Sequence, residues 1–312
     1  MKTLSSVLAF LLVLPAYGQE FKKTATSGFV FLEIPVTART AALGEASLSL
    51  SDVNAEGVFA NPASVGFTTQ THSASFSYAP WIAEMKHYAS SYAYDSPLGV
   101  FAVGVIVFDF GSMPRTQRAS GRQVYEVVGD FNANGLCVGL TYSKRLTDRF
   151  SFGVTTKYVR EGIDIYRASN VLFDGGVLYY TGFQSLRIAA ALQNFGTDAK
   201  YKNDPFKMPS MLRLGMAAEL LGDFSSQYRV SGLVEALHPS DADERVNVGL
   251  EVAWNSVLMV RGGYKFRYDE ETYSVGVGLR PSLAVPVGLD VAFSDYGRLG
   301  NILRFSLQMG LQ

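Results

Sequence analysis

Residues 258–267 read LMVRGGYKFR, and their side chains alternate in character with a period of two. One face of an extended chain here would carry Leu258, Val260, Gly262, Tyr264 and Phe266, and the other would carry Met259, Arg261, Gly263, Lys265 and Arg267. The polar face of a soluble sheet usually carries many Lys, Glu and Thr residues. Small residues with isolated charges instead suit the crowded interior of a barrel, and an apolar face suits lipid. The stretch therefore predicts a strand of a membrane barrel.

The same alternation recurs in about fourteen segments, each close to the length of about ten residues expected of a tilted membrane strand. An even number of strands is typical of bacterial barrels. The sequence thus predicts an all-β fold, a transmembrane antiparallel β-barrel of about fourteen strands with an N-terminal lumenal plug. The segments are 70–79, 86–95, 99–109, 134–146, 149–160, 169–181, 185–195, 210–220, 227–236, 244–254, 257–267, 272–280, 285–294 and 301–311.

The connections between these segments are of two kinds. Links after even-numbered segments are short, whereas several links after odd-numbered segments are long; the long ones are 110–133, 161–168, 196–209 and 237–243. Outer-membrane barrels have short periplasmic turns and longer extracellular loops. This asymmetry predicts a periplasmic N-terminus and extracellular long loops. The short first link, 80–85, is an exception.

Composition agrees with a membrane barrel. Charged residues make up 18% of the 312 residues, below the roughly 25% of typical soluble domains, and there are 30 Gly, 17 Tyr and 21 Phe. The formal net charge of -1 gives no basic patch for a nucleic-acid partner. No stretch reaches the ~20 apolar residues that a spanning helix needs.

The chain divides into three predicted parts. Residues 1–18 have the features of a secretory signal peptide, with Lys2 before an apolar core and the small-x-small site Ala16-Tyr17-Gly18. Residues 19–67 form an N-terminal plug segment, and residues 68–312 form the barrel. The predicted location is the outer membrane of a Gram-negative cell, with surrounding lipid as one partner.

Residues 19–67 lack a strand-like alternation and contain several Gly and Pro residues. They are too few for an independent core and too apolar for a disordered tail. A fourteen-stranded lumen is wider than its own side chains can fill, so this segment would fill it. Asp52 would cap a short helix starting near Val53, and Asn61-Pro62 would end it. The alternative is an extension outside the barrel.

No catalytic constellation is evident, and the chain is predicted to be a non-enzymatic protein without cofactor or metal. The three histidines, His72, His87 and His238, have no metal-ligand spacing, and the single Cys137 makes neither a zinc cluster nor an intramolecular disulfide. A barrel hydrolase using His87 and a lumenal serine is a distant alternative. Buried charges must be paired; the expected lumenal ion pairs join Glu33, Arg39 and Glu45 to Lys157, Arg187, Arg261 or Asp290.

The long loops are the predicted binding surface, because loops on a rigid scaffold usually carry function. A mixture of apolar, aromatic and arginine residues suits a protein partner, and it could equally line the mouth of a pocket for a hydrophobic molecule. The candidate residues are Met113, Arg115, Arg118 and Tyr125 in the first long loop and Tyr201, Phe206 and Met208 in 196–209.

Several motifs in order resemble the PorV/PorQ outer-membrane proteins, a family within the wider FadL-like barrel group. They are the Leu32-Glu33-Ile34-Pro35-Val36 run, Ala38-Arg39, Ala41-Ala42-Leu43-Gly44, Asp52, Asn61-Pro62-Ala63 and the closing Ser294-Asp295-Tyr296-Gly297 region. The resemblance implies a lumenal plug in which Glu33, Pro35, Arg39, Asp52, Asn61 and Pro62 are the characteristic residues. The chain departs from the pattern at Glu45, where a second glycine is common, and at its end, Leu311-Gln312, which lacks a terminal aromatic residue.

Two functions follow from the resemblance as expectations. The first is a component of a type IX-like protein secretion system, whose partners would be secretion-system proteins or the C-terminal domains of exported cargo. The second is a FadL-like passive transporter of hydrophobic small molecules or lipid, with the plug as its gate. A continuous apolar pocket against the plug, opening sideways between strands, would favour transport, whereas a filled lumen with an exposed apolar loop patch would favour partner binding.

Overall fold

The structure is a computed structural model that describes residues 26–119 and 124–311. The predicted signal peptide, residues 1–18, and the first residues of the predicted plug segment lie outside the described residues. The earliest described backbone contact is a bridge between Ser27 and Lys207, in the loop region 196–209.

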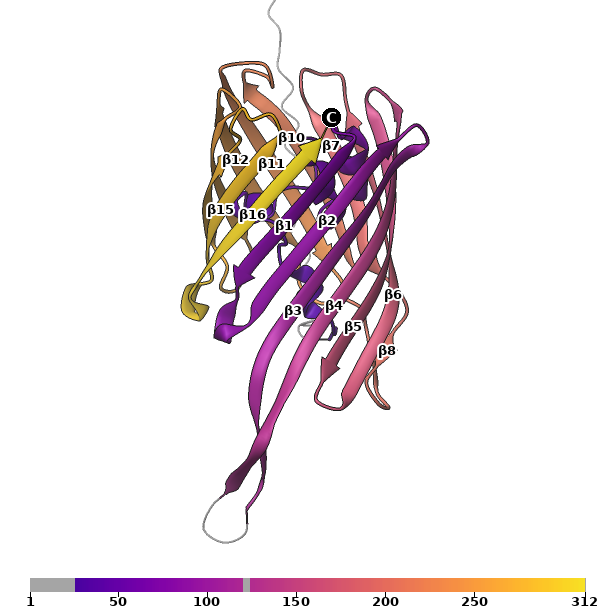
Figure 1. Ribbon diagram of the computed structural model, residues 1–312, viewed down its shortest axis with the longest axis vertical. Helices are drawn as coiled ribbons and strands as arrows, with labels where there is room; N and C mark the ends of the chain where they lie inside the picture. Colours follow the sequence, from indigo (N-terminus) through magenta and orange to yellow (C-terminus); the bar gives the residue numbers. More distant parts are fainter. Residues whose placement is uncertain (1–25, 120–123, 312) are drawn as a thin grey trace, which may run out of the picture.

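Fourteen strands form one closed antiparallel barrel, which confirms the predicted fold class (Figure 1). The ladder closes where β1 pairs with β16, with Phe76 opposite Leu307. The order around the barrel is β1-β16-β15-β14-β13-β12-β11-β10-β7-β6-β5-β4-β3-β2. The strands are β1 (His72–Pro80), β2 (Lys86–Ser96), β3 (Gly99–Arg118), β4 (Tyr125–Thr147), β5 (Phe150–Ile163), β6 (Tyr166–Tyr180), β7 (Arg187–Phe195), β10 (Met211–Leu221), β11 (Tyr228–Pro239), β12 (Arg245–Trp254), β13 (Leu258–Phe266), β14 (Tyr273–Leu279), β15 (Val287–Asp295) and β16 (Asn301–Leu311).

The long-loop end differs from the prediction in one major respect. Most of residues 110–133 were predicted as loop but are strand, because β3 and β4 continue as a paired hairpin out to Arg118 and Tyr125. This β3–β4 hairpin extends well beyond the rest of the barrel (Figure 1). The region 196–209 also contains a two-stranded sheet of β8 (Ala199–Lys200) and β9 (Pro205–Phe206). Short helical turns, η4 (Ile82–Glu84) and η5 (Gly297–Leu299), lie in two other connections.

The two faces of the wall have the chemistry predicted from the alternation. In β1, Ser73, Ser75 and Ser77 are buried on the inside, whereas Phe76 is 50% exposed on the outside. The outward band continues around the barrel through Leu140, Val154, Ile188, Leu214, Val234, Leu250, Val260, Val277, Val291 and Phe305. Such a band fits hydrocarbon, and a closed barrel leaves no unpaired strand edge in the lipid. The barrel therefore has the architecture of a protein of the Gram-negative outer membrane.

None of the helices in residues 26–119 and 124–311 combines the length and the hydropathy that crossing a bilayer requires.

Residues 29–67, here called the lumenal segment, run inside the barrel as short helical pieces (Figure 1). The pieces are η1 (Val30–Glu33), α1 (Ala38–Ala42), η2 (Asn54–Phe59) and η3 (Pro62–Phe67). The Thr37 side chain caps α1 by accepting from the Thr40 amide, and Asn61 caps η3 by accepting from the Ala63 amide. Asn61-Pro62 directly follows the end of η2, as predicted, and it also begins η3, because proline suits the first helical position.

The lumenal segment crosses much of the lumen and is largely buried. Phe29 and Phe31 pack with Phe108, Leu172 and Met208 near the end of the barrel that carries the β3–β4 hairpin. η3 packs on β4, β5 and β6 near the opposite end, where the Ala63 carbonyl accepts from Ser151 at 2.8 Å. This segment thus fills the space that fourteen strands enclose.

Close approach of the backbone at Gly263 sets the fit between α1 and the wall. Gly44 follows α1 with φ of +61°, a conformation that glycine adopts readily. A methyl group on Gly263 would lie 2.0 Å from the Gly44 nitrogen, whereas a methyl group on the adjacent Gly262 would meet nothing within 4 Å. The two glycines alternate between the inner and outer faces of β13, so only Gly263 touches the lumenal segment.

We expect Gly263→Ala to destabilise the folded barrel by about 1–3 kcal/mol, because the extra methyl forces a packed backbone apart. Gly262→Ala is the matched control and should change stability by about 0.5 kcal/mol or less. Urea unfolding in detergent, followed by the mobility of folded barrel on unheated gels, measures both. Equal effects of the two substitutions would contradict the described packing of α1.

Candidate functional site

A buried cluster of charges ties the lumenal segment to the barrel wall. The carboxylate of Glu251 on β12 accepts from three guanidinium groups, those of Arg39 in α1, Arg229 on β11 and Arg261 on β13. The distances are 3.0, 2.8 and 2.7 Å respectively, and Glu251 is 1% exposed. Arg39 also donates to the Asp52 carboxylate at 3.0 Å. Arg39 therefore links two parts of the lumenal segment, α1 and Asp52, and also links the segment to the wall.

Ion pairs join the lumenal segment to the wall, as expected, but none of the predicted pairings is present among the described residues. Glu33 makes no ion pair there, and Arg39 and Glu45 have other partners. Arg39 pairs with Glu251 rather than with Asp290, and Asp52 binds Arg39 instead of capping a helix; Val53 occupies that cap position. Arg261 pairs with both Glu251 and Asp290. Glu251 was missed, although its place on the small and charged face of its strand would have identified it as inward-facing.

Two further contacts anchor the lumenal segment, through Glu45 and Leu48. Glu45 pairs with Lys265, which also pairs with Glu271. The Leu48 amide donates to Glu235 at 3.0 Å. Arg187 and Arg213 also donate to carbonyl oxygens of the segment, those of Ser49 and Glu45. The other ion pairs between wall residues in the lumen are Arg187–Glu219, Arg213–Glu235, Lys157–Asp174 and Arg280–Asp290.

Removing the Arg39 guanidinium should loosen the lumenal segment. We expect Arg39→Gln to cost about 3–5 kcal/mol, because it leaves buried carboxylates with fewer partners. The control is Arg115→Gln, which breaks an ion pair with Asp164 whose arginine side chain is 45% exposed, and which should cost about 0–1 kcal/mol.

Urea unfolding in detergent gives the free energies, and limited proteolysis reports cleavage within residues 29–67 of the folded barrel. If Arg39→Gln is no more destabilising than Arg115→Gln, the charge cluster does not hold the segment in place.

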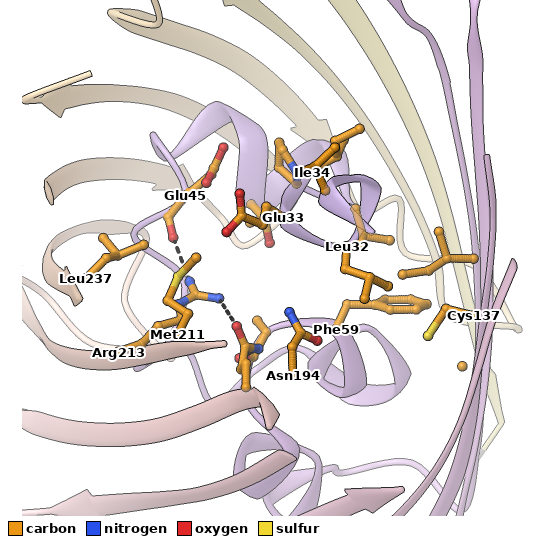
Figure 2. A pocket seen from close by; sticks show the side chains of 18 of the residues that line it. Leu32, Glu33, Ile34, Glu45, Phe59, Cys137, Asn194, Met211, Arg213 and Leu237 are labelled. Carbon is orange, nitrogen blue, oxygen red and sulfur yellow. Dashed lines mark hydrogen bonds between the residues drawn. The ribbon is translucent and has the colours of Figure 1, made fainter. Parts of the chain in front are cut away.

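A cavity of about 260 Å³ lies between the lumenal segment and the wall. Leu32 and Glu33 of η1 and the following Ile34 face it from one side and Phe59 of η2 from another, with Cys137 on the wall (Figure 2). Apolar and polar side chains both reach the cavity. Its further lining includes Trp81, Gly104, Ile106, Gly139, Thr141, Thr155, Lys157, Gln193, Asn194, Met211, Arg213 and Tyr268.

Lys157 and Arg213, two basic side chains that line this lumenal cavity, already have acidic partners. Lys157 pairs with Asp174 and also donates to Asn194 at 2.9 Å. Arg213 pairs with Glu235. In contrast, the Oε1 atom of Glu33 is inaccessible and has no hydrogen-bond partner among the described residues.

Burial raises the pKa of two carboxyl groups of the lumenal segment. The pKa of Glu33 rises to about 7, first because of burial and second because of the Asp241 charge. Burial likewise raises the pKa of Glu56 in η2 to about 7, and the Asp290 charge adds to this effect. Both groups therefore change charge near neutral pH.

A second cavity, of about 310 Å³, lies nearer the short-turn end. It is lined by Glu56, Gln70, Ser75, Arg280 and Gln308 among others. The first turn of η2 borders this second cavity, whereas Val58 to Ala60 at its other end border the lumenal cavity. η2 therefore stands between the two spaces.

The predicted binding residues separate into two groups. Met113, Arg115, Arg118 and Tyr125 lie on the β3–β4 hairpin, and Tyr125 is 62% exposed. Tyr201, Phe206 and Met208 instead pack inward. The rings of Tyr201 and Phe206 stack at 5.3 Å, Phe206 lies 5.8 Å from Phe29, and Met208 is buried. This second group supports the start of the lumenal segment.

The plug residues of the sequence prediction all lie in the lumenal segment. Arg39 and Asp52 join the charge cluster, and Asn61-Pro62 begins η3. Glu33 faces the lumenal cavity, which Pro35 also lines.

Among the described residues, His87 and Arg304 are buried basic side chains in which every side-chain nitrogen lacks a hydrogen-bond partner. His87 on β2 is fully buried with neither ring nitrogen bonded, and Arg304 on β16 has no hydrogen bond among the described residues. The Arg304 guanidinium carbon lies 5.7 Å from the centre of the Trp81 ring. Within the described part of the chain, no group of three or more His, Cys, Asp or Glu residues could hold a metal ion.

No protein-family model matches the sequence, and no curated protein matches it. Solved structures do match in fold. The Ralstonia pickettii toluene transporter TbuX aligns with a TM-score of 0.62 at 14% identity, covering 88% of this chain and 98% of TbuX. The Pseudomonas putida toluene transporter TodX gives 0.57 at 12% identity, covering 88% and 96%. A Pseudomonas aeruginosa FadL homologue gives 0.56 at 11% identity, covering 89% and 99%.

These likenesses show a shared fold, the fourteen-stranded barrel of FadL-type outer-membrane proteins. At such low identity they do not carry over a ligand or a binding site. The more specific PorV/PorQ assignment has no support among these structures.

Proposed function

We propose that this protein is a non-enzymatic channel that takes hydrophobic small molecules across the outer membrane. The observation that carries the proposal is the lumenal cavity between η1, η2 and the wall. Its volume of about 260 Å³ is enough for a small aromatic molecule, since an apolar cavity of about 150 Å³ can bind benzene. Two structures with the same fold are toluene transporters, so toluene is a reasonable first ligand to test.

In this proposal the lumenal segment is a plug that gates the channel. η2 separates the lumenal cavity from the second cavity, so a ligand must displace it to move on. The buried Arg39–Glu251 and Arg39–Asp52 contacts hold α1, and they leave η1 and η2 on the cavity side. Movement would then be local, because the anchors at α1 and η3 remain.

Filling the cavity should block uptake. We expect Cys137→Phe to lower toluene uptake by expressing cells to that of cells without the protein, because the new ring occupies ligand space. Leu140→Phe is the control, since Leu140 lies on the same strand but faces lipid at 66% exposure. Uptake of labelled toluene is the measurement, and gel mobility of the unheated barrel checks folding.

Reaction of folded wild-type protein with a small methanethiosulfonate tests the same site without a substitution, because Cys137 is its sole cysteine. Toluene should slow this reaction. Unchanged uptake in Cys137→Phe, or no uptake above background in the wild type, would contradict the proposal.

A second candidate is partner binding in a type IX-like secretion pathway, by way of the β3–β4 hairpin. Val124, Tyr125 and Val127 are each at least 60% exposed there, and Arg115 and Arg118 lie on the paired strand. Aromatic, apolar and arginine side chains together suit a protein interface. In this role the hairpin would contact secretion-system proteins or cargo C-terminal domains.

Deleting the hairpin separates the two candidates. A chain lacking residues 111–132 should keep toluene uptake if the lumenal cavity carries the function. If partner binding is the function, secretion proteins that co-purify with the wild-type barrel from its native membrane should be lost in the deletion. Absence of any such proteins from the wild-type preparation would rule out the second candidate.

A further inference from the structure

We propose that the lumenal cavity selects small apolar molecules that carry a hydrogen-bond donor, a protonated amine above all, with Glu33 as the acceptor. This inference rests on the proposed function and names the substrate class of the same site. It concerns the polar end of the ligand, whereas the apolar side chains of the lining, such as Leu32, Ile34 and Phe59, would contact the rest.

The carboxylate of Glu33 is an unused acceptor. Glu33 reaches the cavity from η1 (Figure 2) and makes no ion pair among the described residues, and its inaccessible Oε1 atom has no hydrogen-bond partner there either. A largely buried carboxylate without a partner costs free energy that a ligand can recover by donating to the carboxylate from the cavity side. An apolar molecule such as toluene would leave this carboxylate unpaired, whereas an alcohol or amine would not.

The charged groups around Glu33 are mostly negative. The charged groups that face Glu33 are Asp241, Arg245, Glu45 and Glu271, three carboxyl groups and one guanidinium. Glu45 and Glu271 share Lys265. Counting Lys265 with these four groups leaves a net charge of -1 before Glu33 ionises and -2 afterwards. The surroundings therefore favour a cation beside Glu33 and oppose an anion.

The basic side chains that line the cavity already contact other residues of the protein. Lys157 pairs with Asp174, and Arg213 pairs with Glu235. The Arg245 guanidinium lies over the Tyr268 ring, 4.5 Å from its centre. Arg304, which lacks a hydrogen bond among the described residues, is not in the cavity lining. A ligand carboxylate would have to displace an existing contact to find a partner.

Four probes with one ring test the inference: toluene, benzyl alcohol, benzylamine and benzoate. The fluorescence of Trp81 reports binding, because this residue lines the cavity. Trp254→Phe removes the other tryptophan of the chain, which is 48% exposed on the lipid side. We expect affinity to fall in the order benzylamine, benzyl alcohol, toluene, benzoate, with about tenfold between benzylamine and toluene, as for one charge-assisted hydrogen bond.

Glu33→Gln should remove the tenfold preference for benzylamine and leave the affinity for toluene nearly unchanged. Glu56→Gln is the matched control, because Glu56 is a buried carboxyl group of the same segment that lines the other cavity. It should leave all four affinities as they are. Benzylamine binding to the wild type should also strengthen as pH rises through about 7, where Glu33 ionises, and toluene binding should not.

The outcomes separate this inference from the proposed function. Equal affinities for benzylamine and toluene, or tightest binding of benzoate, would overturn the inference and leave a hydrophobic channel in place. A benzylamine preference that survives Glu33→Gln would overturn it as well. If none of the four probes changes Trp81 fluorescence or competes for Cys137, both the inference and the proposed function fail.

Discussion

The contact of Glu251 with three arginines is the interaction on which the arrangement of the lumen depends. Fourteen strands enclose more space than their own side chains fill, so some other part of the chain must enter. Arg39 makes that entry specific, because it joins α1, which packs on β13 to β16, to Glu251 on β12 and fixes Asp52 at the same time. The cavity exists because this anchor holds one side of the lumenal segment and leaves η1 and η2 to face open space.

The barrel could be predicted from the sequence because residues of a membrane strand face lipid and lumen in turn. Lipid on one side and a packed lumen on the other impose a period of two, and Arg261 and Lys265 fell on the inner face as expected. The β3–β4 hairpin escaped prediction because beyond Asp109 it meets water on both faces. Where both faces of a strand are in water, apolar and polar residues need not alternate. The sequence of the hairpin therefore carries no period-two pattern that would reveal its two strands.

The candidate site was predictable only in part. Pairing of lumenal charges could be predicted, because burying an isolated charge is costly. That Arg39 pairs with Glu251 could not, because it depends on which wall residue of the closed barrel lies beside α1. Likewise, Tyr201, Phe206 and Met208 have the composition of an interface, and only the folded structure shows that they pack on Phe29 and Phe31. The proposed role of Glu33 as a ligand acceptor depends on which charged side chains lie near it and which of them are already paired. The sequence does not give these neighbours.

If small hydrophobic molecules bind between the lumenal segment and the wall, a crystal of the protein soaked with 4-bromotoluene will hold one there, where bromine can be located by its anomalous scattering. We expect a bromine peak in the lumenal cavity, among Leu32, Phe59 and Cys137. Bromine peaks only on the lipid-facing surface, with the cavity empty of ligand, would contradict this expectation.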